Sequence, residues 1–346
     1  MRALWSGIDT LEVSYRGTFI DHLCDFLREL KSEAQGLDRA IPVRGFTEDF
    51  VISPQGLKPW SWRLLNEDMD LRLSEAETIP NVSVRLSSLG LAAYGAEPLL
   101  ARADGHIADL GHFESPAVSR LDLFADIQGF EPDAGVMAGI VCPAAYRGTH
   151  AAGSSIQTFQ YGKGAIVARV YNKTAEIAVS GKAWLRGVWA SCEGFEPDAD
   201  VWRVEYQLRR DFLKELKFTE GRYPPAVFAH TGDLWATALA WCDLRVPNGE
   251  NKTRWARHPA WEVLAEIAPD SVPHARIKSV SYSEGFEAVV PQIAGLLVSA
   301  SSAVSMWDLD SAQQEMDRLV QEYIDERGVP FRDLVRRRTH QRLAGR

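Results

Sequence analysis

Three short segments that alternate apolar and polar residues constrain the fold of this chain more than any other feature of its sequence. They are residues 118–127 (VSRLDLFADI), 166–173 (IVARVYNK) and 201–209 (VWRVEYQLR). Successive side chains of a strand point to opposite faces of its sheet, so each segment predicts a strand with one apolar and one polar face. Such strands are typical of an antiparallel sheet that packs its apolar face on helices.

The polar faces of these strands carry a chemically varied set of side chains. They are Arg120, Asp122 and Asp126, then Arg169, Tyr171 and Lys173, and then Arg203, Glu205 and Arg209. If the three strands share one sheet, these groups gather on one face. The plain alternative is a half-solvated sheet with cross-strand ion pairs, in which Asp122 is a partner of Arg120 or Arg203.

The carboxylates of this set indicate a metal site. Asp122 and Glu205, with Asp126, offer the oxygen ligands that Mg²⁺ or Mn²⁺ prefers. Such an ion polarises a phosphodiester and stabilises the charge that develops when it is displaced in line.

The tyrosine and the cations add a nucleophile and phosphate contacts. Tyr171 is the candidate nucleophile, and Tyr161, ten residues earlier, competes with it. A phenol with a pKa of about 10 has to lose its proton to attack, which a nearby Lys173 or Arg169 favours. The arginines expected to bind phosphate oxygens are Arg120, Arg169, Arg203 and Arg209.

The rest of the chain predicts an α+β organisation. Residues 8–15 and 82–86 alternate as strands do, whereas residues 37–80 are rich in turn signals. Helices are expected at 19–31, 90–103, 224–244, 258–267, 291–302 and 311–327. Because strands dominate the first two-thirds, we expect a sheet domain over residues 1–250 and a helical C-terminal region over 251–346. The polar turn PNGEN marks the boundary.

Charge and hydropathy narrow the class of protein. The 38 basic and 47 acidic residues leave a net charge of −9, which by itself argues against a general affinity for nucleic acid. Seven arginines nevertheless lie in the basic tail, residues 327–346, as either a solvated helix end or a phosphate contact. No apolar run is long enough for a membrane span and no signal peptide opens the chain, so we expect a cytoplasmic protein without membrane contact.

The cysteines and histidines give no local metal motif. Cys24, Cys142, Cys192 and Cys242 are far apart and form no Cys-x-x-Cys pattern. In a chain of this length they indicate small buried apolar side chains and not a disulfide framework or a zinc site. The histidines are scattered and form no His-hydrophobic-His pair.

The three strands with their flanks resemble one known family. The blocks SRLDLFAD (119–126), ARVYNKTAE (168–176) and WRVEYQLRRD (202–211) are similar in order, spacing and content to the replication initiation factor family, Rep_trans. Members of that family initiate rolling-circle replication of small plasmids and some filamentous phages, and some are relaxases of integrative conjugative elements. The resemblance covers residues 80–215.

The resemblance implies a fold and a set of roles. The fold is an antiparallel-sheet nuclease core related to the HUH endonucleases, with carboxylates in place of the histidine pair. Tyr171 matches the tyrosine that becomes joined to the 5′ phosphate, and Lys173 follows it near the scissile phosphate. Asp122 and Glu205 match acidic positions of the Mg²⁺ or Mn²⁺ site. The third ligand stays open among Asp126, Asp9 and Glu12.

We therefore expect a rolling-circle replication initiator that nicks and rejoins single-stranded or hairpin origin DNA through a 5′-phosphotyrosyl intermediate. The family implies a homodimer that works with a host helicase and polymerase. Three alternatives remain open: a relaxase of a mobile element with the same chemistry, a non-catalytic DNA-binding regulator, and a metal-dependent phosphoesterase without a covalent step.

Overall fold

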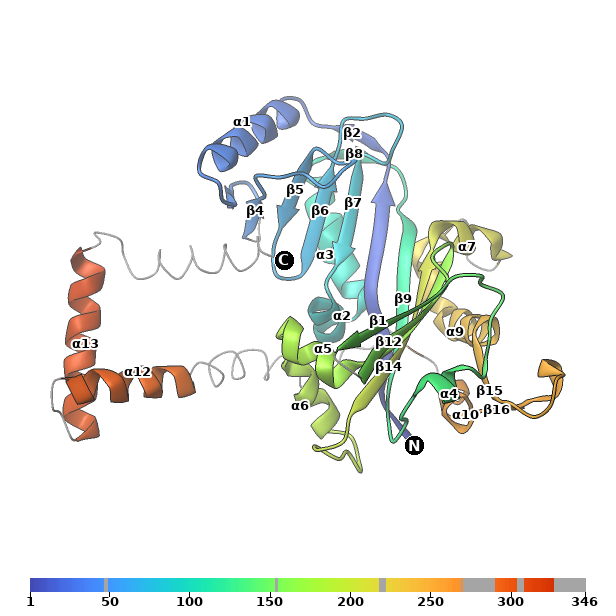
Figure 1. The fold of residues 1–346 in the computed structure, drawn as a ribbon. Coiled ribbons are helices and arrows are strands. Elements are labelled where there is room, and N and C mark those ends of the chain that lie inside the picture. Colours follow the sequence, from blue (N-terminus) through green and yellow to red (C-terminus); the bar gives the residue numbers. More distant parts are fainter. Residues whose placement is uncertain are drawn as a thin grey trace.

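The computed structural model describes residues 1–46, 49–152, 155–217, 222–267, 269, 290–303 and 308–326. These residues form a mixed α+β fold around one eleven-stranded antiparallel sheet (Figure 1). The α+β class and the antiparallel sheet expected from the sequence are thus confirmed. The segment 279–289 and the basic tail 327–346 lie outside the described residues.

The large sheet brings the three alternating segments together as neighbours. In spatial order its strands are β11 (Arg147–Ala152), β12 (Ser155–Tyr161), β13 (Ile166–Asn172), β14 (Val201–Arg209), β9 (Ala117–Gln128), β1 (Arg2–Tyr15), β7 (Val82–Leu86), β6 (Met69–Leu73), β5 (Trp62–Leu65), β4 (Phe50–Ile52) and β3 (Ile41–Val43). Two small sheets contain β10 (Ile140–Val141), β15 (Asp243–Val246) and β16 (Ala256–Arg257), and β2 (Gly17–Phe19) and β8 (Gly111–Phe113).

The helices follow the expected pattern with several shifts. They are α1 (Leu23–Gly36), α2 (Ser88–Tyr94), α3 (Ala96–Ala108), α4 (Ala134–Met137), α5 (Lys173–Ser180), α6 (Trp184–Ala190), α7 (Arg210–Glu215), α8 (Pro224–Ala229), α9 (Thr231–Trp241), the 3₁₀ turn η2 (Lys252–Arg254), α10 (Pro259–Ala265), α12 (Val290–Ala303) and α13 (Leu309–Glu326). Within the described part of the chain, no helix is both long and apolar enough to cross a membrane.

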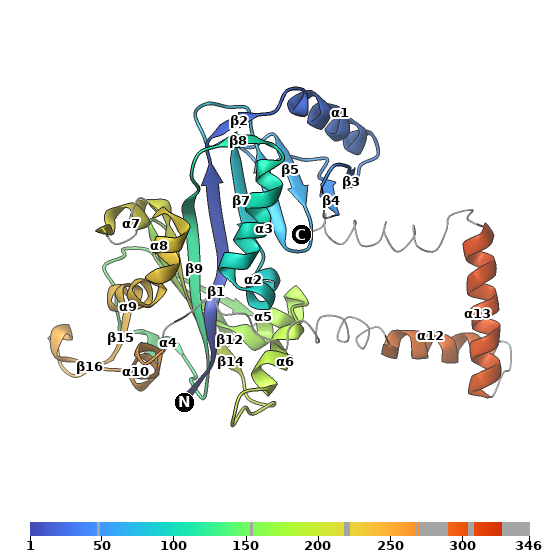
Figure 2. The ribbon, with the colours of Figure 1, turned by 180° about the vertical axis from the view of Figure 1, so that it is seen from behind.

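The apolar faces of the strands form the core. Leu121, Leu123 and Ile127 on β9 are fully buried, as the period of two predicts. Helices α3, α8, α9 and α10 cover this face, which is turned toward the viewer in Figure 2. Helix α6 lies on the opposite face, because the Trp189 indole donates a hydrogen bond to Asp126 on the polar side of β9.

Three segments differ from expectation for local reasons. The turn-rich stretch 37–80 contains the strands β3 to β6. Strands β3, β4 and β5 are three or four residues long and so too short to show a clear period, whereas β6 (MDLRL) alternates but lies between turn signals. The helix expected at 90–103 is divided by Gly95, whose φ of 82° is strained for other residues. The helix expected at 224–244 breaks at His230 and ends before β15.

Packing continues past residue 250, where the sequence indicates a boundary. Trp261 in α10 is fully buried in the core, and its indole N–H donates to the Cys242 carbonyl at 2.9 Å. Its ring also lies edge-on to Phe130, which follows β9. Helix α10 therefore belongs to the same core as the sheet.

We predict that Trp261→Ala lowers the free energy of unfolding by about 3–5 kcal/mol, because it leaves a cavity in the core. Urea titration of the full chain measures this difference. Trp255→Ala is the control, since that half-exposed ring contributes only a peripheral contact and its loss changes the midpoint little. Equal midpoints for both variants would show that α10 does not unfold with the sheet.

Candidate functional site on the polar face of the sheet

The strand register places the predicted side chains on one face. Tyr171 on β13 is opposite Arg203 on β14, and Arg203 is opposite Asp126 on β9. One step of two residues along, Arg169 is opposite Glu205. The three strands therefore share one sheet, and their polar side chains lie together on one face, as expected for that case.

Tyr171 and Glu205 are in direct contact on this face. The Tyr171 hydroxyl donates to Oε2 of Glu205 at 2.9 Å, and Arg169 Nη1 binds Oε1 of the same carboxylate at 3.1 Å. Arg169 also donates to Gln207. Burial, together with the negative charge of Glu205, raises the pKa of Tyr171 well above its usual value. The phenol is therefore protonated at neutral pH, with a proton acceptor already in contact.

Arg203 is the most buried cation of the site. Its Nε and Nη2 donate to the two carboxylate oxygens of Asp126 at 2.6 and 2.9 Å, and its Nη1 donates to Asp9 at 2.6 Å. The guanidinium lies over the Phe124 ring, 3.7 Å from its centroid. Asp126 also accepts from the Trp189 indole at 2.9 Å. We call Arg203, Asp126 and Asp9 the Arg203 clamp.

A β-bulge supplies the third member of the clamp. In β1, Ile8 is opposite Leu123 and Thr10 is opposite Asp122, so Asp9 is an extra residue between two regular pairs. A bulge of this kind redirects a side chain, here onto the polar face. Burial opposes ionisation of Asp9, but the charges of Arg203, Lys182 and Lys173 outweigh it and lower its pKa to about 2. Strict alternation gives no signal for this placement.

Asp122 lies beside the clamp and is paired with Arg120. Nε of Arg120 donates to Oδ1 of Asp122 at 2.8 Å, which confirms the ion pair weighed as the plain alternative. Burial and the charges of Glu205 and Asp9 raise the pKa of Asp122 to about 7, against the opposing effect of Arg120. Asp122, Glu205 and Asp9 therefore repel one another across the face.

Lys173 begins helix α5 directly after the tyrosine strand. Asn172 caps this helix by accepting a hydrogen bond from the Ala175 N–H, so the Tyr-Asn-Lys block encodes a strand end and a helix start. The Lys173 ammonium lies 2.6 Å from Glu176 and 5.4 Å from the centre of the Tyr171 ring. Burial, with the positive charge of Arg203, lowers its pKa. The N-cap signal of Asn172 was readable in the sequence.

Two other candidates make contacts of a different kind. Arg209, the exposed last residue of β14, is opposite Arg120 on β9, and its side chain donates to the Lys163 carbonyl. Tyr161 is buried and opposite Ala168, on the core face, where its hydroxyl donates to the Met137 carbonyl at 3.4 Å. The structure therefore separates Tyr161 from the carboxylates of the polar face, whereas Tyr171 lies among them.

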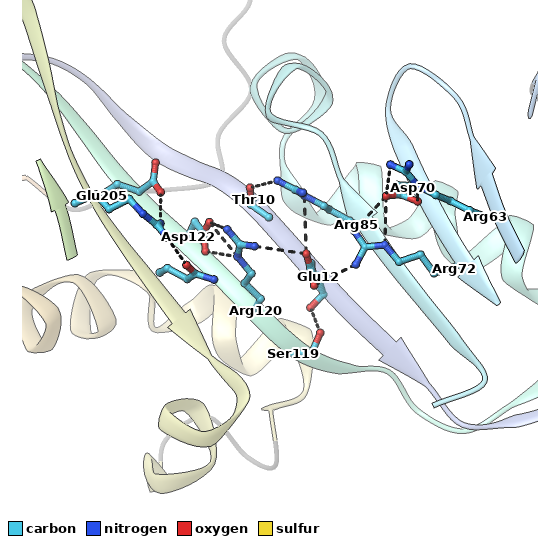
Figure 3. Close-up of polar contacts among 12 residues, drawn as sticks. Thr10, Glu12, Arg63, Asp70, Arg72, Arg85, Ser119, Arg120, Asp122 and Glu205 are labelled. Atoms are coloured by element: carbon cyan, nitrogen blue, oxygen red, sulfur yellow. Dashed lines mark hydrogen bonds and ion pairs between the residues drawn. The ribbon is translucent and has the colours of Figure 1, made fainter. Parts of the chain in front are cut away.

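The polar contacts extend beyond the site across the neighbouring strands (Figure 3). Glu12 on β1 lies 3.8 Å from Arg120, 3.6 Å from Arg72 and 3.9 Å from Arg85. Asp70 on β6 then binds Arg72 and Arg63 at 3.1 and 3.0 Å. Acidic and basic side chains thus alternate from β14 to β5.

The expected metal ligands do not converge in this arrangement. Asp126 is fully buried with both oxygens on Arg203, Asp122 binds Arg120, and Glu205 binds Arg169 and Tyr171. Among the residues that the structure describes, no group of three His, Cys, Asp or Glu side chains is placed to hold a metal ion. This donor set does not fit Mg²⁺ or Mn²⁺ as it lies, and the cation requirement stays a prediction.

Neither the known family models nor the curated proteins contain a match to this chain.

We predict that Arg203→Ala lowers the free energy of unfolding by about 3–5 kcal/mol, because it leaves the buried Asp126 carboxylate unpaired. Chemical denaturation of the purified variant tests this. The matched control is Arg209→Ala on the same strand, where the exposed side chain contributes less than about 0.5 kcal/mol. A clamp that does not stabilise the sheet would give the two variants the same loss.

We also predict a pH-dependent difference between Asp122→Asn and the parent chain. The pKa of Asp122 is raised from 3.8 to about 7, so its contribution to stability is complete below pH 4 and is lost as the pH rises to 7. The asparagine variant has no such loss, and its stability relative to the parent rises over this range by up to about 1.4 kcal/mol per pH unit.

We predict that Asp9→Asn changes the stability with pH in the direction opposite to Asp122→Asn. The pKa of Asp9 is lowered to about 2, so its stabilisation is present above pH 4 and is lost on acidification toward pH 2. Denaturation curves from pH 2 to 8 separate the two effects. A constant offset for both variants would contradict these assignments.

Proposed function

We propose that the chain is a tyrosine-type DNA nicking and joining enzyme that forms a 5′-phosphotyrosyl intermediate through Tyr171. The observation that carries this proposal is the 2.9 Å hydrogen bond from the Tyr171 hydroxyl to the Glu205 carboxylate. It sets a nucleophile and a general base in contact at a partly exposed strand end, beside arginine side chains.

The raised pKa of Tyr171 determines how the attack proceeds. A free phenolate is disfavoured by burial and by the charge of Glu205, so the proton passes to Oε2 of Glu205 as the phenol oxygen bonds to phosphorus. Arg169 holds Glu205 in position through Oε1, which leaves Oε2 to receive the proton.

Two arginines are the groups that we expect to bind the phosphate. Arg169 and Arg120 are each about one-quarter exposed, so both guanidinium groups can reach a phosphate oxygen at the surface. The bond from phosphorus to the 3′ oxygen breaks, the 3′ oxygen takes a proton from solvent, and the 5′ phosphate stays on Tyr171. The energy of the phosphotyrosyl bond then permits rejoining: the 3′ hydroxyl attacks phosphorus and loses its proton to solvent, the bond from phosphorus to the Tyr171 oxygen breaks, and Glu205 returns its proton to that oxygen.

The biological role follows from the resemblance of the three strand blocks. It supports initiation of rolling-circle replication at a single-stranded or hairpin origin, by a homodimer assisted by a host helicase and polymerase. A relaxase of a mobile element uses the same chemistry and is the second candidate for the pathway. A cation such as Mg²⁺ or Mn²⁺ enters the proposal as a condition to be varied and has no step assigned to it.

We predict that the full chain, mixed with single-stranded oligonucleotides from the origin region of its own genetic element, forms a protein–DNA adduct that survives denaturation. Tyr171→Phe abolishes this adduct because it lacks the attacking oxygen. Tyr161→Phe is the matched control and retains it, since that hydroxyl faces the core. Denaturing gel electrophoresis of labelled DNA, with Mg²⁺, Mn²⁺ or a chelator, measures the adduct and any cation requirement.

A second variant tests the base. Glu205→Gln slows adduct formation by about 10²–10⁴-fold while the Tyr171 hydroxyl is kept. Cleavage without an adduct, unchanged in Tyr171→Phe, would establish a phosphoesterase instead. Binding without cleavage under every condition would establish a non-catalytic DNA-binding regulator.

A further inference from the structure

Two cysteines that are a hundred positions apart meet at the small sheet beside the core. In the antiparallel pair of β10 and β15, Ile140 is opposite Leu244 and Val141 is opposite Asp243. Continued by one residue beyond these pairs, the register sets Cys142 against Cys242, and a hydrogen bond joins the two thiols. The spacing of cysteines in the sequence gave no sign of this pair.

The hydrogen bonds of this ladder define the kind of pair. The Arg245 N–H donates to the Gly139 carbonyl, so that pair is hydrogen-bonded, and from there pairs without and with hydrogen bonds alternate along the ladder. Cys142 and Cys242 occupy a position without ladder hydrogen bonds, and the Cys242 N–H donates to the Ala238 carbonyl of α9. Cα atoms of a pair that is not hydrogen-bonded lie about 4.5 Å apart, which is within the range of about 4.4–6.8 Å for a disulfide.

The two thiols differ in reactivity. Cys142 is partly exposed, whereas Cys242 is buried. A hydrogen bond from the Cys242 thiol lowers the pKa of Cys142 to about 7, with help from the Ala144 N–H and the charge of Arg147. The same contact, with burial, raises the pKa of Cys242. Cys142 is therefore suited to attack a disulfide as a thiolate, and Cys242 is suited to resolve the mixed disulfide that results.

The other two cysteines lack this activation. Burial and the charge of Glu75 raise the pKa of Cys24 to about 11. Burial also raises the pKa of Cys192, whose thiol donates to the Leu4 carbonyl. Neither forms a comparable thiolate near neutral pH.

We propose that Cys142 and Cys242 are a redox-active dithiol that closes reversibly to a disulfide when a small disulfide oxidant is present. This modification site is independent of the proposed DNA chemistry on the opposite face of the sheet. The disulfide joins the end of β10 to the residue between α9 and β15, whose carbonyl accepts from both Tyr206 and Trp261.

The reaction balances with oxidised glutathione as the oxidant. The Cys142 thiolate attacks one glutathione sulfur, a mixed disulfide forms, and one glutathione thiolate leaves and takes a proton. The Cys242 thiol then loses its proton to solvent and attacks the Cys142 sulfur, which releases the second glutathione. Two protein thiols are oxidised, and one glutathione disulfide is reduced to two thiols.

The test treats the reduced full chain with oxidised glutathione, alkylates the remaining thiols with N-ethylmaleimide and determines the intact mass. We expect two thiols to be protected, the mass of two hydrogen atoms to be lost before alkylation, and a non-reducing peptide map to link Cys142 to Cys242. Dithiothreitol restores both thiols. The double variant Cys24→Ser/Cys192→Ser gives the same result.

Single variants separate the steps. Cys242→Ala stops at a glutathione adduct on Cys142 and slows alkylation of Cys142 at pH 7 about fivefold, because alanine has no donor to replace the hydrogen bond that favours the thiolate. Cys142→Ser removes both the adduct and the disulfide. In the parent chain, Cys142 is alkylated faster than Cys24 and Cys192 at pH 7, which does not depend on the folding of any variant. A stable glutathione adduct on the parent, a link between two chains, or equal alkylation rates would overturn the proposal.

Discussion

The guanidinium of Arg203 is the buried charge around which the centre of this protein is organised. Removing such a group from water costs several kcal/mol, and only well-aligned opposite charges offset that penalty. Asp126 and Asp9 supply these charges from two other strands, and the Trp189 indole of helix α6 holds Asp126 in place by donating a hydrogen bond to it. The same contacts fix β14 against β9 and β1, and so fix where Tyr171, directly opposite Arg203, presents its hydroxyl. The clamp is structural, yet the geometry of the candidate site depends on it.

How much the sequence predicts depends on whether a feature is local. The period of two in β9, β13 and β14 predicts the strands and both of their faces, because alternation is a property of each strand alone. Which acid meets which arginine depends on the register between strands, so Asp126 was expected near a metal and is instead a partner of Arg203. The bulge that turns Asp9 to the polar face breaks the period and is invisible to it. Strand β5 is too short to show a period, and β6 alternates but lies between turn signals. The ion pairs of Arg63, Asp70 and Arg72 that join these strands depend on the register as well.

Local charge on the polar face has little to do with the net charge of the chain. Four arginines across this face each have an acidic neighbour: Arg169, Arg120, Arg72 and Arg63. A phosphate that approaches the face therefore competes with carboxylates that already bind these arginines. Under the proposed function, the least enclosed guanidinium groups are the ones that an incoming strand reaches first. The raised pKa of Asp122 adds to this balance, because its protonation removes one competing negative charge near neutral pH.

The position of β1 in the sheet has a consequence for synthesis of the chain. This strand is made first but lies in the middle, and it gains its neighbours only after β7 and then β9 have been translated. Asp9 and Arg203 are 194 residues apart. A nascent chain that ends before β14 therefore carries Asp9 and Asp126 without the cation between them and leaves an edge of β9 unpaired. Contacts over such a distance close slowly, and open strand edges favour aggregation, so this protein is one whose growing chain stands to gain from ribosome-bound chaperones.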